Sequence, residues 1–269
     1  MKQYRICTLY SGSGGNAVLM EAADTRILID AGKSARTLCR ALSSVGCEVG
    51  QLDAIFITHE HSDHVSALEV LAKKIAAPIH ITEESAQRFD RLSPSPLHER
   101  LVRHAPRFAV QVGGLTVRSF CTPHDSRMSV GYRVEFSDED GAHALGLATD
   151  VGYVTEEIAK SLEGCEAVVL ESNHDVEMLK AGPYPYDLKK RILSRRGHLS
   201  NEDSAVFSAH LAAHGTKAFL LAHLSAENNT PQLAYDAHVA TLADPRLRVV
   251  VAAADEPVEL CGREEVPLC

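Results

Sequence analysis

The stretch ITHEHSDHV, residues 57–65, places three histidines and an aspartate within six positions, directly after an apolar run. His59 and His61 follow the end of that run, and Asp63 and His64 stand where a helix is expected to start. Imidazole and carboxylate ligands together suit zinc, manganese or iron better than calcium. Four donors so close together cannot all reach one ion without strain, so we predict two neighbouring ions. A solvated polar loop is the alternative, and the length of the pattern disfavours it.

Three further metal donors each end an apolar run later in the chain. His124 ends SFCTPH, Asp150 ends LGLATD, and His223 ends FLLAH. Taken singly, each could be an ordinary polar residue that caps a strand. Because the ends of neighbouring strands meet at one edge of a sheet, the three together predict that edge loops bring these donors to one site, beside the four-donor cluster.

Apolar periodicity predicts strands and helices that alternate along the whole chain. Strands are expected at residues 4–9, 17–20, 26–30, 53–58, 78–82, 107–121 (as a hairpin), 130–136, 143–149, 166–172, 217–223 and 247–254. Helices are expected at residues 34–45, 62–76 (capped by Ser62), 83–91, 155–162, 185–196, 201–214 and 231–243. Hairpins stand beside crossovers, so we predict an α/β fold with two mixed sheets and helices outside them. No repeat or low-complexity linker divides residues 1–269, which predicts a single domain.

The composition is that of a soluble enzyme, with 45% apolar and 23% charged residues. No apolar run approaches the roughly 20 residues that a membrane span needs, and we expect no signal peptide. The seven cysteines are scattered without a CxxC pair, so we expect no disulfide framework and a cytoplasmic location. The net charge of −9 and the absence of tryptophan argue mildly against nucleic acid as a partner, although a local basic patch stays possible.

The motif THEHSDH, followed in order by His124, Asp150 and His223, resembles the metallo-β-lactamase superfamily over nearly the whole chain. The resemblance implies an αββα sandwich with a two-metal site at the sheet edges. It also implies that Asp150 bridges the two ions. The implied ligand sets are His59, His61 and His124 for one ion, and Asp63, His64 and His223 for the other.

The resemblance further implies a hydrolytic mechanism, in which a hydroxide between the two ions is the nucleophile. Two positive ions lower the pKa of the water and stabilise developing charge, and Asp63 is expected to be essential for this chemistry. His198 matches a histidine that related ribonucleases place near the scissile phosphate, where it could donate a proton to the leaving oxygen; an ordinary loop histidine is the alternative. Asp30 matches the superfamily's early aspartate and is expected to orient a ligand, unless it is a plain turn residue.

Details of the motifs narrow the choice within the superfamily. The bridging residue is an aspartate rather than the cysteine of many true β-lactamases, and the second motif histidine is not the glutamate of flavo-diiron relatives. SGSGGNA (11–17), ESNHD (171–175) with GHLSNEDSA (197–205), and HLSAENN (223–229) resemble the YycJ/WalJ-like subgroup. This resemblance implies a phosphodiester hydrolase, most simply a DNA exonuclease that acts from the 5′ end and uses two divalent ions of zinc, manganese or iron.

Several side chains near these motifs are candidates for substrate binding. SGSGGN could form a phosphate-binding nest with Ser13 and Asn16, or it is only a hairpin turn. His174 of ESNHD is expected to line the pocket. The stretch DLKKRILSRRGHLSN could supply phosphate contacts, although a solvated helix face is almost as good an explanation. Its cations are Lys189, Lys190, Arg191, Arg195 and Arg196.

Four functions remain open on the sequence alone. The basic run favours a nuclease, with DNA before RNA as the substrate. The acidic net charge and scarce aromatics favour a phosphodiesterase for small cyclic phosphates. A glyoxalase-type thioesterase and a non-catalytic metal scaffold are weaker alternatives. The stretches between His124, Asp150 and His223 are too short for the inserted domain or arm of RNA-processing relatives. No membrane contact and no obligate protein partner are expected.

Overall fold

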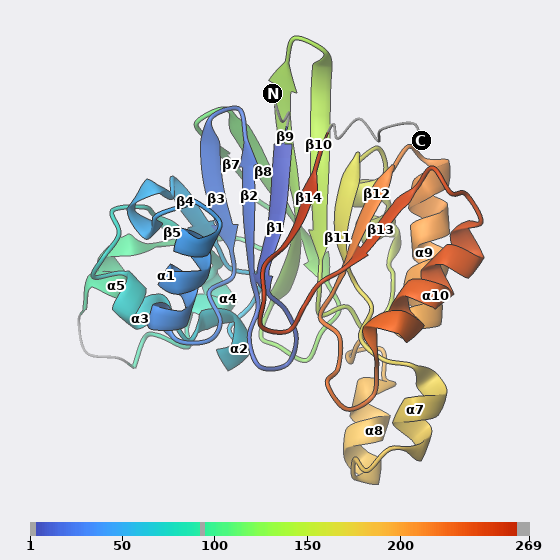
Figure 1. Cartoon of the computed structure of the whole chain (residues 1–269). Coiled ribbons are helices and arrows are strands. Elements are labelled where there is room, and N and C mark those ends of the chain that lie inside the picture. Colours follow the sequence, from blue (N-terminus) through green and yellow to red (C-terminus); the bar gives the residue numbers. More distant parts are fainter. Residues whose placement is uncertain (1–3, 92–94, 263–269) are drawn as a thin grey trace.

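The structure is a computed structural model that describes residues 4–91 and 95–262 (Figure 1). Within these residues two seven-stranded sheets pack face to face. Their strand orders are β14-β1-β2-β3-β4-β5-β6 and β13-β12-β11-β10-β9-β8-β7. The first sheet contains β1 (Tyr4–Tyr10), β2 (Ala17–Ala22), β3 (Thr25–Ile29), β4 (Ala54–Phe56), β5 (Ile79–Thr82), β6 (Leu101–His104) and β14 (Val258–Cys261). The second contains β7 (Ala109–Val112), β8 (Leu115–Thr122), β9 (Ser129–Asp138), β10 (Gly141–Ala148), β11 (Ala167–Glu171), β12 (Ala218–Ala222) and β13 (Arg248–Val251).

Helices cover the outer faces of both sheets (Figure 1). Beside the first sheet lie α1 (Ala35–Ser44), the 3₁₀ turn η1 (Val49–Gln51), α2 (Ser62–Val65), α3 (Leu68–Leu71), α4 (Glu83–Ala86) and α5 (Pro96–Arg100). Beside the second lie α6 (Glu156–Leu162), α9 (Asn201–Ala213) and α10 (Pro231–Leu242). The remaining pair, α7 (Val176–Ala181) and α8 (Tyr186–Ile192), protrudes at the lower edge in Figure 1. The predicted αββα sandwich of two mixed sheets is confirmed.

The main core lies between the two sheets. Ile27 and Phe56 of the first sheet pack in one buried cluster with Tyr132 and Val169 of the second. The Tyr132 hydroxyl donates to the carbonyl of Ile57 at 2.6 Å, which satisfies the one polar atom of that buried ring. The contact also fixes the second sheet against the segment that leads into residues 57–65.

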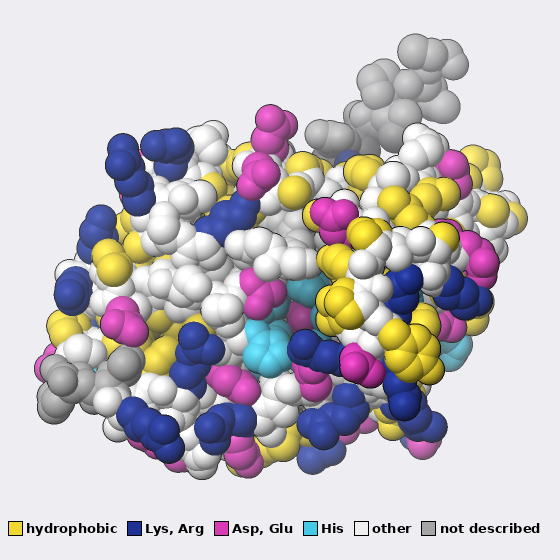
Figure 2. All heavy atoms as spheres, turned by 90° about the horizontal axis from the view of Figure 1, so that it is seen from below, with side chains coloured by type: hydrophobic (Ala, Val, Ile, Leu, Met, Phe, Trp, Pro, Cys, Tyr) yellow, Lys and Arg dark blue, Asp and Glu magenta, His cyan; other side chains and the backbone are white. Residues whose placement is uncertain are grey.

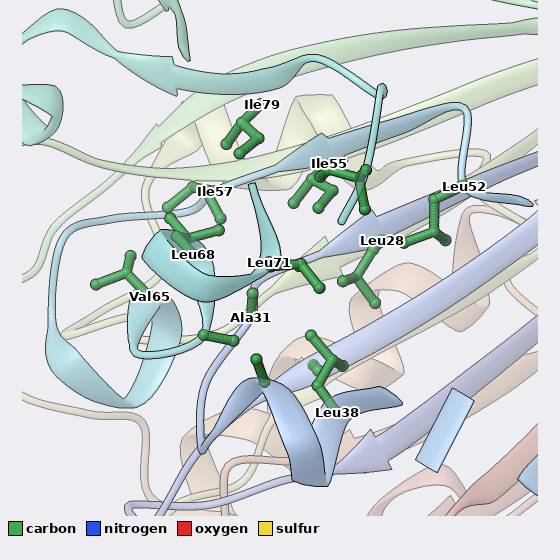
Figure 3. Packing of buried hydrophobic residues seen from close by; sticks show 14 of the residues in the cluster. Leu28, Ala31, Leu38, Leu52, Ile55, Ile57, Val65, Leu68, Leu71 and Ile79 are labelled. Atoms are coloured by element: carbon green, nitrogen blue, oxygen red, sulfur yellow. The ribbon is translucent and has the colours of Figure 1, made fainter. Parts of the chain in front are cut away.

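A second core fills the space between the first sheet and its helices. Leu28 and Ile55 point outward from the sheet and meet Leu38 of α1 and Leu68 and Leu71 of α3, as Figure 3 shows. All five side chains are fully buried. This packing anchors α3, and through it the preceding histidine motif, to the outer face of the sheet.

Three of the strands that end at the metal-donor edge are short and buried on both faces. In β4, β11 and β12 every residue is buried, and β11 pairs in parallel with both β10 and β12. Parallel strands that are covered on both faces have continuous apolar sequences. These strands could therefore be predicted from the sequence. Their carboxyl ends meet at the lower edge of the molecule.

The predicted helix over residues 62–76, capped by Ser62, is wrong in detail. The helix begins at Ser62 with His61 in the N-cap position, stops at Val65, and resumes as α3. The cause is a contact with another segment: the backbone N–H of Ala31 donates to the carbonyl of His64 at 2.7 Å, and the N–H of Ala67 donates to the carbonyl of Ala31 at 2.9 Å. These bonds take groups that a continuous helix would have used.

Five described elements were not predicted: η1, α5, β6, α7 and β14. Conversely, the helices expected at 83–91 and 185–196 are shorter than predicted and end at Ala86 and Ile192. The six cysteines within the described residues are free, and Cys269 lies outside that part of the chain. Among the described helices, none combines the length and apolarity that a membrane crossing requires.

Candidate metal centre

The predicted metal donors converge at the lower edge of the sandwich. His59 to His64 follow β4 of the first sheet, and His124, Asp150 and His223 follow β8, β10 and β12 of the second. Figure 2, which views this edge from below, shows histidine and acidic side chains at the bottom of a hollow with lysines and arginines around it. The edge loops of two sheets therefore build one site, as the strand-end pattern predicted.

The seven donors form overlapping groups whose ligand atoms lie within 4.8 Å of one another. One oxygen of Asp150 lies 3.4 Å from Nε2 of His64, and its other oxygen lies 3.5 Å from Nε2 of His223 and 3.6 Å from Nε2 of His124. Asp150 thus stands between the two halves of the cluster. The groups are His59, His61 and His124; Asp63, His64 and His223; and His59, His64 and Asp150.

The donor atoms themselves indicate that the cluster is made for a cation. Nε2 of His59, Nε2 of His223 and Oδ2 of Asp150 are buried and have no hydrogen-bond partner among the described residues. Leaving a buried polar atom unpaired costs about 1–3 kcal/mol, so three in one cluster are expected only where a ligand completes them. Imidazole nitrogen with carboxylate oxygen is a donor set that suits a divalent transition metal.

In three of the cluster's imidazoles, the ring nitrogen that points away from the cluster has a hydrogen-bond partner. His59 Nδ1 lies 3.0 Å from the Thr58 hydroxyl, His64 Nδ1 lies 2.8 Å from Asp30, and His124 Nδ1 lies 3.2 Å from the carbonyl of Gly197. An N–H held at Nδ1 leaves the lone pair on Nε2, which is the atom that faces the cluster. The tautomers that metal binding requires are therefore built into the surrounding hydrogen bonds.

Asp30 connects several parts of the cluster. It is buried, and its carboxylate accepts from the backbone N–H and the hydroxyl of Thr58 as well as from His64. Burial lowers the pKa of His64, but Asp30 and Asp150 outweigh burial and hold that pKa well above its ordinary value. A metal ion bound at Nε2 would replace the proton that these carboxylates otherwise stabilise.

Three residues at the site leave their strands in a left-handed backbone conformation. The φ angles of Asp30, Asp150 and His223 are 63°, 58° and 59°. Residues other than glycine seldom adopt this conformation, which costs of order 1–3 kcal/mol unless the surroundings enforce it. The turn at each strand end redirects the next residues, so a polar side chain can point into the site directly after an apolar strand.

Glu171 is a component that the sequence analysis did not assign. It ends β11 with no exposed surface, and its Oε1 accepts from Nδ1 of His198 at 2.8 Å and from Nδ1 of His223 at 3.0 Å. Its other oxygen accepts the backbone N–H groups of Val151 and Leu199. Burial raises the pKa of Glu171, but His198 outweighs burial and holds it well below the ordinary value. A carboxylate at the end of an apolar run is the signal, already used for Asp150, that would have found it.

The glycine loop supports the cluster from the side of the first sheet. Asn16 is buried, its backbone N–H donates to the Asp63 carbonyl at 2.8 Å, and its side-chain nitrogen lies 3.2 Å from Nε2 of His64. Gly32, in the turn after β3, packs against the backbone of Asp63, and a Cβ at Gly32 would stand 1.9 Å from the Asp63 carbonyl oxygen. Ser13 is exposed at the tip of the loop. Loop and histidine motif are thus held together by backbone contacts that leave no room for side chains.

The basic run divides into side chains with different surroundings. Lys189 donates to the carbonyls of Lys180 and Gly182, both at 2.7 Å, and so closes the end of α7. Arg191 forms an ion pair with Asp125, the residue after His124. Lys190 is exposed. The guanidinium groups of the remaining two cations lie over the Tyr153 ring (Arg195) and against the His124 carbonyl (Arg196).

A pocket of about 230 Å³ adjoins the cluster under α8. Tyr184, Leu188 and Ile192 form its apolar side, and His198 and Arg191 contribute polar groups. Ser13, Asp125, Asn173, Gly197 and Ser225 complete the lining. His174, expected in the pocket, is only 1% exposed and is absent from this lining.

Comparison with known proteins places this geometry in context. Residues 25–224 match the family model described as the β-lactamase superfamily domain. The chain is 36% identical to exodeoxyribonuclease WalJ of Streptococcus pneumoniae over 92% of this chain and 91% of that protein, and 36% identical to exodeoxyribonuclease YycJ of Bacillus anthracis over 84% of each. Among solved structures, the metallo-β-lactamase fold protein YhfI of Bacillus subtilis superposes with a TM-score of 0.72 over 96% of this chain and 99% of that one, at 16% identity.

Proposed function

The chain belongs to the metallo-β-lactamase superfamily and is a metal-dependent hydrolase of the nuclease type; we propose that it removes nucleotides from the 5′ end of DNA with two divalent ions. The observation that carries the proposal is the continuity between the donor cluster and the pocket under α8. His198 lines that pocket and is tied through Glu171 to His223 of the cluster. A phosphodiester in the pocket would therefore lie beside both the ions and a proton donor.

We assign one ion to the three-histidine group and the other to the group with Asp63, with Asp150 between them. When bound, such ions provide Lewis acidity toward phosphate oxygens and lower the pKa of a water molecule toward neutrality. Zinc and manganese suit the donor set, and iron is a further possibility. The assigned ligands are His59, His61 and His124; Asp63, His64 and His223; and the shared Asp150.

His198 is the residue we assign to proton transfer. Its Nδ1 is engaged by the buried Glu171 carboxylate, which leaves Nε2 for the substrate. The ring is the more exposed partner, with 18% of its side-chain surface accessible and Glu171 at 0%. The carboxylate fixes the direction of the ring, so His198 is placed to donate a proton from Nε2 to the leaving oxygen as the phosphodiester bond breaks.

The pocket and its rim fit the end of a DNA strand. The apolar side formed by Tyr184, Leu188 and Ile192 can contact a nucleobase, because aromatic and aliphatic side chains bind bases without selecting one of them. Arg191 stands at the same pocket and can contact a phosphate by a charge-assisted hydrogen bond. The small volume suits one nucleotide, which favours attack at an end over attack within a strand.

The same volume supports a second candidate, hydrolysis of a small cyclic phosphodiester. A pocket of about 230 Å³ suits such a ligand as well as it suits a terminal nucleotide. The two candidates differ in what lies outside the pocket: only a polymer needs contacts along α8. The relatives named as exodeoxyribonucleases favour the polymer.

The test compares end-labelled double-stranded DNA with bis-p-nitrophenyl phosphate, each treated with metal-loaded and with chelator-stripped protein. We expect metal-dependent release of 5′-terminal nucleotides together with cleavage of the small diester. Cleavage of the small diester with intact DNA would favour the cyclic phosphodiesterase. Asp63→Ala should abolish both activities, and Asp236→Ala on the surface of α10 is the control. Wild-type rates in Asp63→Ala would overturn the metal mechanism.

A further inference from the structure

A second group of histidine and carboxylate side chains lies on the surface of the described residues, away from the metal centre. His210 and His214 stand one turn apart at the C-terminal end of α9 and face Glu163, the residue that follows α6. One nitrogen from each imidazole and one oxygen of the carboxylate lie within 4.8 Å of one another. Residues four apart on a helix share a face, which brings both rings to the same carboxylate.

The distances suit a single ion. His210 Nε2 lies 2.8 Å and His214 Nε2 lies 4.0 Å from Oε1 of Glu163, and the two ring centroids are 4.3 Å apart. Metal bonds of about 2 Å to nitrogen and oxygen can join atoms up to about 4 Å apart. The three side chains are between 33% and 44% exposed, so water can complete the coordination. Binding therefore requires only small side-chain rotations.

The His214 ring is held in the tautomer that binds metal. Its Nδ1 donates to the carbonyl of His210 at 2.7 Å, so the proton is on Nδ1 and the Nε2 lone pair is free. The same bond fixes the direction of the ring. The His210 ring lies nearly parallel to the Phe207 ring, with the two ring centroids 6.1 Å apart, which limits the rotation of His210.

The backbone beneath the cluster is also fixed. The N–H of Gly164 donates to the His214 carbonyl at 3.2 Å, which joins the end of α9 to the turn after α6. Arg133 donates to the carbonyl of Glu163 at 2.9 Å. Because both sides of the cluster are already in place, an ion would not have to order the chain, and little affinity is lost to ordering.

We propose that Glu163, His210 and His214 bind a divalent transition-metal ion, such as zinc or copper, at a surface site separate from the active centre. Two imidazoles exclude a preference for magnesium or calcium, which favour oxygen ligands. The 13 residues of α9, at about 1.5 Å each, place this site about 20 Å from the start of α9 next to His198. The proposal does not depend on the proposed nuclease activity. An ion here would tie the end of α6 to the end of α9 and stabilise both.

The experiment counts zinc per chain in protein whose active centre is already loaded. Equilibrium dialysis at fixed micromolar free zinc, followed by atomic emission, should give one more zinc in the wild type than in the double variant His210→Gln/His214→Asn. Glu163→Gln should weaken the extra site by about tenfold or more. His98→Gln, at a half-buried histidine of α5, is the matched control and should keep the extra zinc. DNA cleavage should be unchanged in the double variant.

Copper and thermal melting provide independent measurements. Copper(II) added to the loaded wild type should give an electron paramagnetic resonance signal with nitrogen hyperfine structure, absent from the double variant. Zinc should raise the melting temperature of the wild type above that of the double variant, while both melt alike without added metal. Equal zinc content in the wild type and the double variant would overturn the proposal, as would wild-type protein that takes up no zinc beyond its active centre.

Discussion

Oε1 of Glu171 lies 2.8 Å from Nδ1 of His198, and the same oxygen lies 3.0 Å from Nδ1 of His223. One fully buried carboxylate thus orients two imidazoles, of which we assign one to proton transfer and the other to metal binding. The backbone N–H groups of Val151 and Leu199 hold its second oxygen, so the carboxylate cannot rotate away. Proton donor and metal ligand are therefore coupled through a residue that need not touch the substrate.

Replacing this carboxylate should impair both histidines at once. We expect Glu171→Gln to lower kcat by about 10- to 100-fold on DNA and on the small diester, because the amide keeps one acceptor oxygen and cannot accept from both the two rings and the backbone N–H groups of Val151 and Leu199. Metal affinity should also fall, since His223 loses its anchor. Glu166→Gln, at the opposite end of the same strand region and paired with His143, is the matched control.

A double-mutant cycle separates positioning from general destabilisation. If Glu171 acts on catalysis through His198, Glu171→Gln should reduce kcat much less in a His198→Ala background than in the wild type. Equal reductions in both backgrounds, at equal metal content, would contradict the positioning role. The pH profile of kcat adds a readout that a purely structural defect would not change.

Asp30 should control metal affinity rather than substrate affinity. Its carboxylate accepts from His64 and Thr58 and does not line the pocket under α8. We expect Asp30→Asn to weaken metal binding by about 10- to 100-fold, measured by competition with a chelator, and to leave KM unchanged once metal is saturating. Asp53→Asn, an exposed aspartate at the start of β4, should bind metal as the wild type does. Unaltered metal affinity in Asp30→Asn would show that Asp30 only closes a turn.

The residues of this site that the sequence predicts are those that directly follow an apolar run. Donors such as Asp150 and His223 follow apolar runs, and these strand ends meet at one edge of the described sheets. Glu171 has the same pattern, at the end of the apolar run AVVL, but the sequence analysis did not assign it. The burial of Asn16 against Asp63 and the break after Val65 depend on contacts with a distant segment, which local periodicity does not encode.

The same difference between local sequence patterns and contacts with distant segments explains which helices and strands were predicted. Buried strands were predicted from their apolar runs and α1 from its apolar periodicity. The longer helices α9 and α10 were also predicted. β6 has mostly exposed or half-buried residues, and β14 exists only through its antiparallel pairing with β1, where Arg5 lies opposite Cys261. Short elements of this kind gain their stability from a neighbour and not from their own sequence.

Substitutions in the basic run should have two different effects, one on DNA binding and one on stability. Arg191→Ala should raise KM for DNA by about tenfold while sparing bis-p-nitrophenyl phosphate, because a charge-assisted contact to a phosphate of the polymer is lost. Lys189→Ala should instead lower stability by about 1 kcal/mol, since its ammonium closes α7 through the carbonyls of Lys180 and Gly182. Steady-state kinetics and urea unfolding of the two variants distinguish these effects. Unchanged DNA cleavage by Arg191→Ala would count against a DNA path along α8.

His238 should make the fold sensitive to acid. The residue is fully buried in α10, where Nδ1 donates to the Ala234 carbonyl at 2.8 Å and Nε2 lies 3.1 Å from the Ser204 hydroxyl. Burial lowers its pKa from 6.5 to about 4. Between these two values the unfolded chain binds a proton that the folded protein does not, so the free energy of unfolding must fall as the pH falls. Above pH 6.5 this histidine adds no pH dependence.

The size of the effect follows from the two pKa values. At about 1.4 kcal/mol per unit, His238 alone should cost the protein about 3 kcal/mol as the pH falls from 6.5 to 4. Urea unfolding across this range should therefore give a shallower pH dependence for His238→Gln than for the wild type, whatever stability the variant loses at neutral pH. His98→Gln, which leaves the buried ring in place, should keep the wild-type slope. Parallel curves for the wild type and His238→Gln would mean that the folded protein accepts the proton at His238 without penalty.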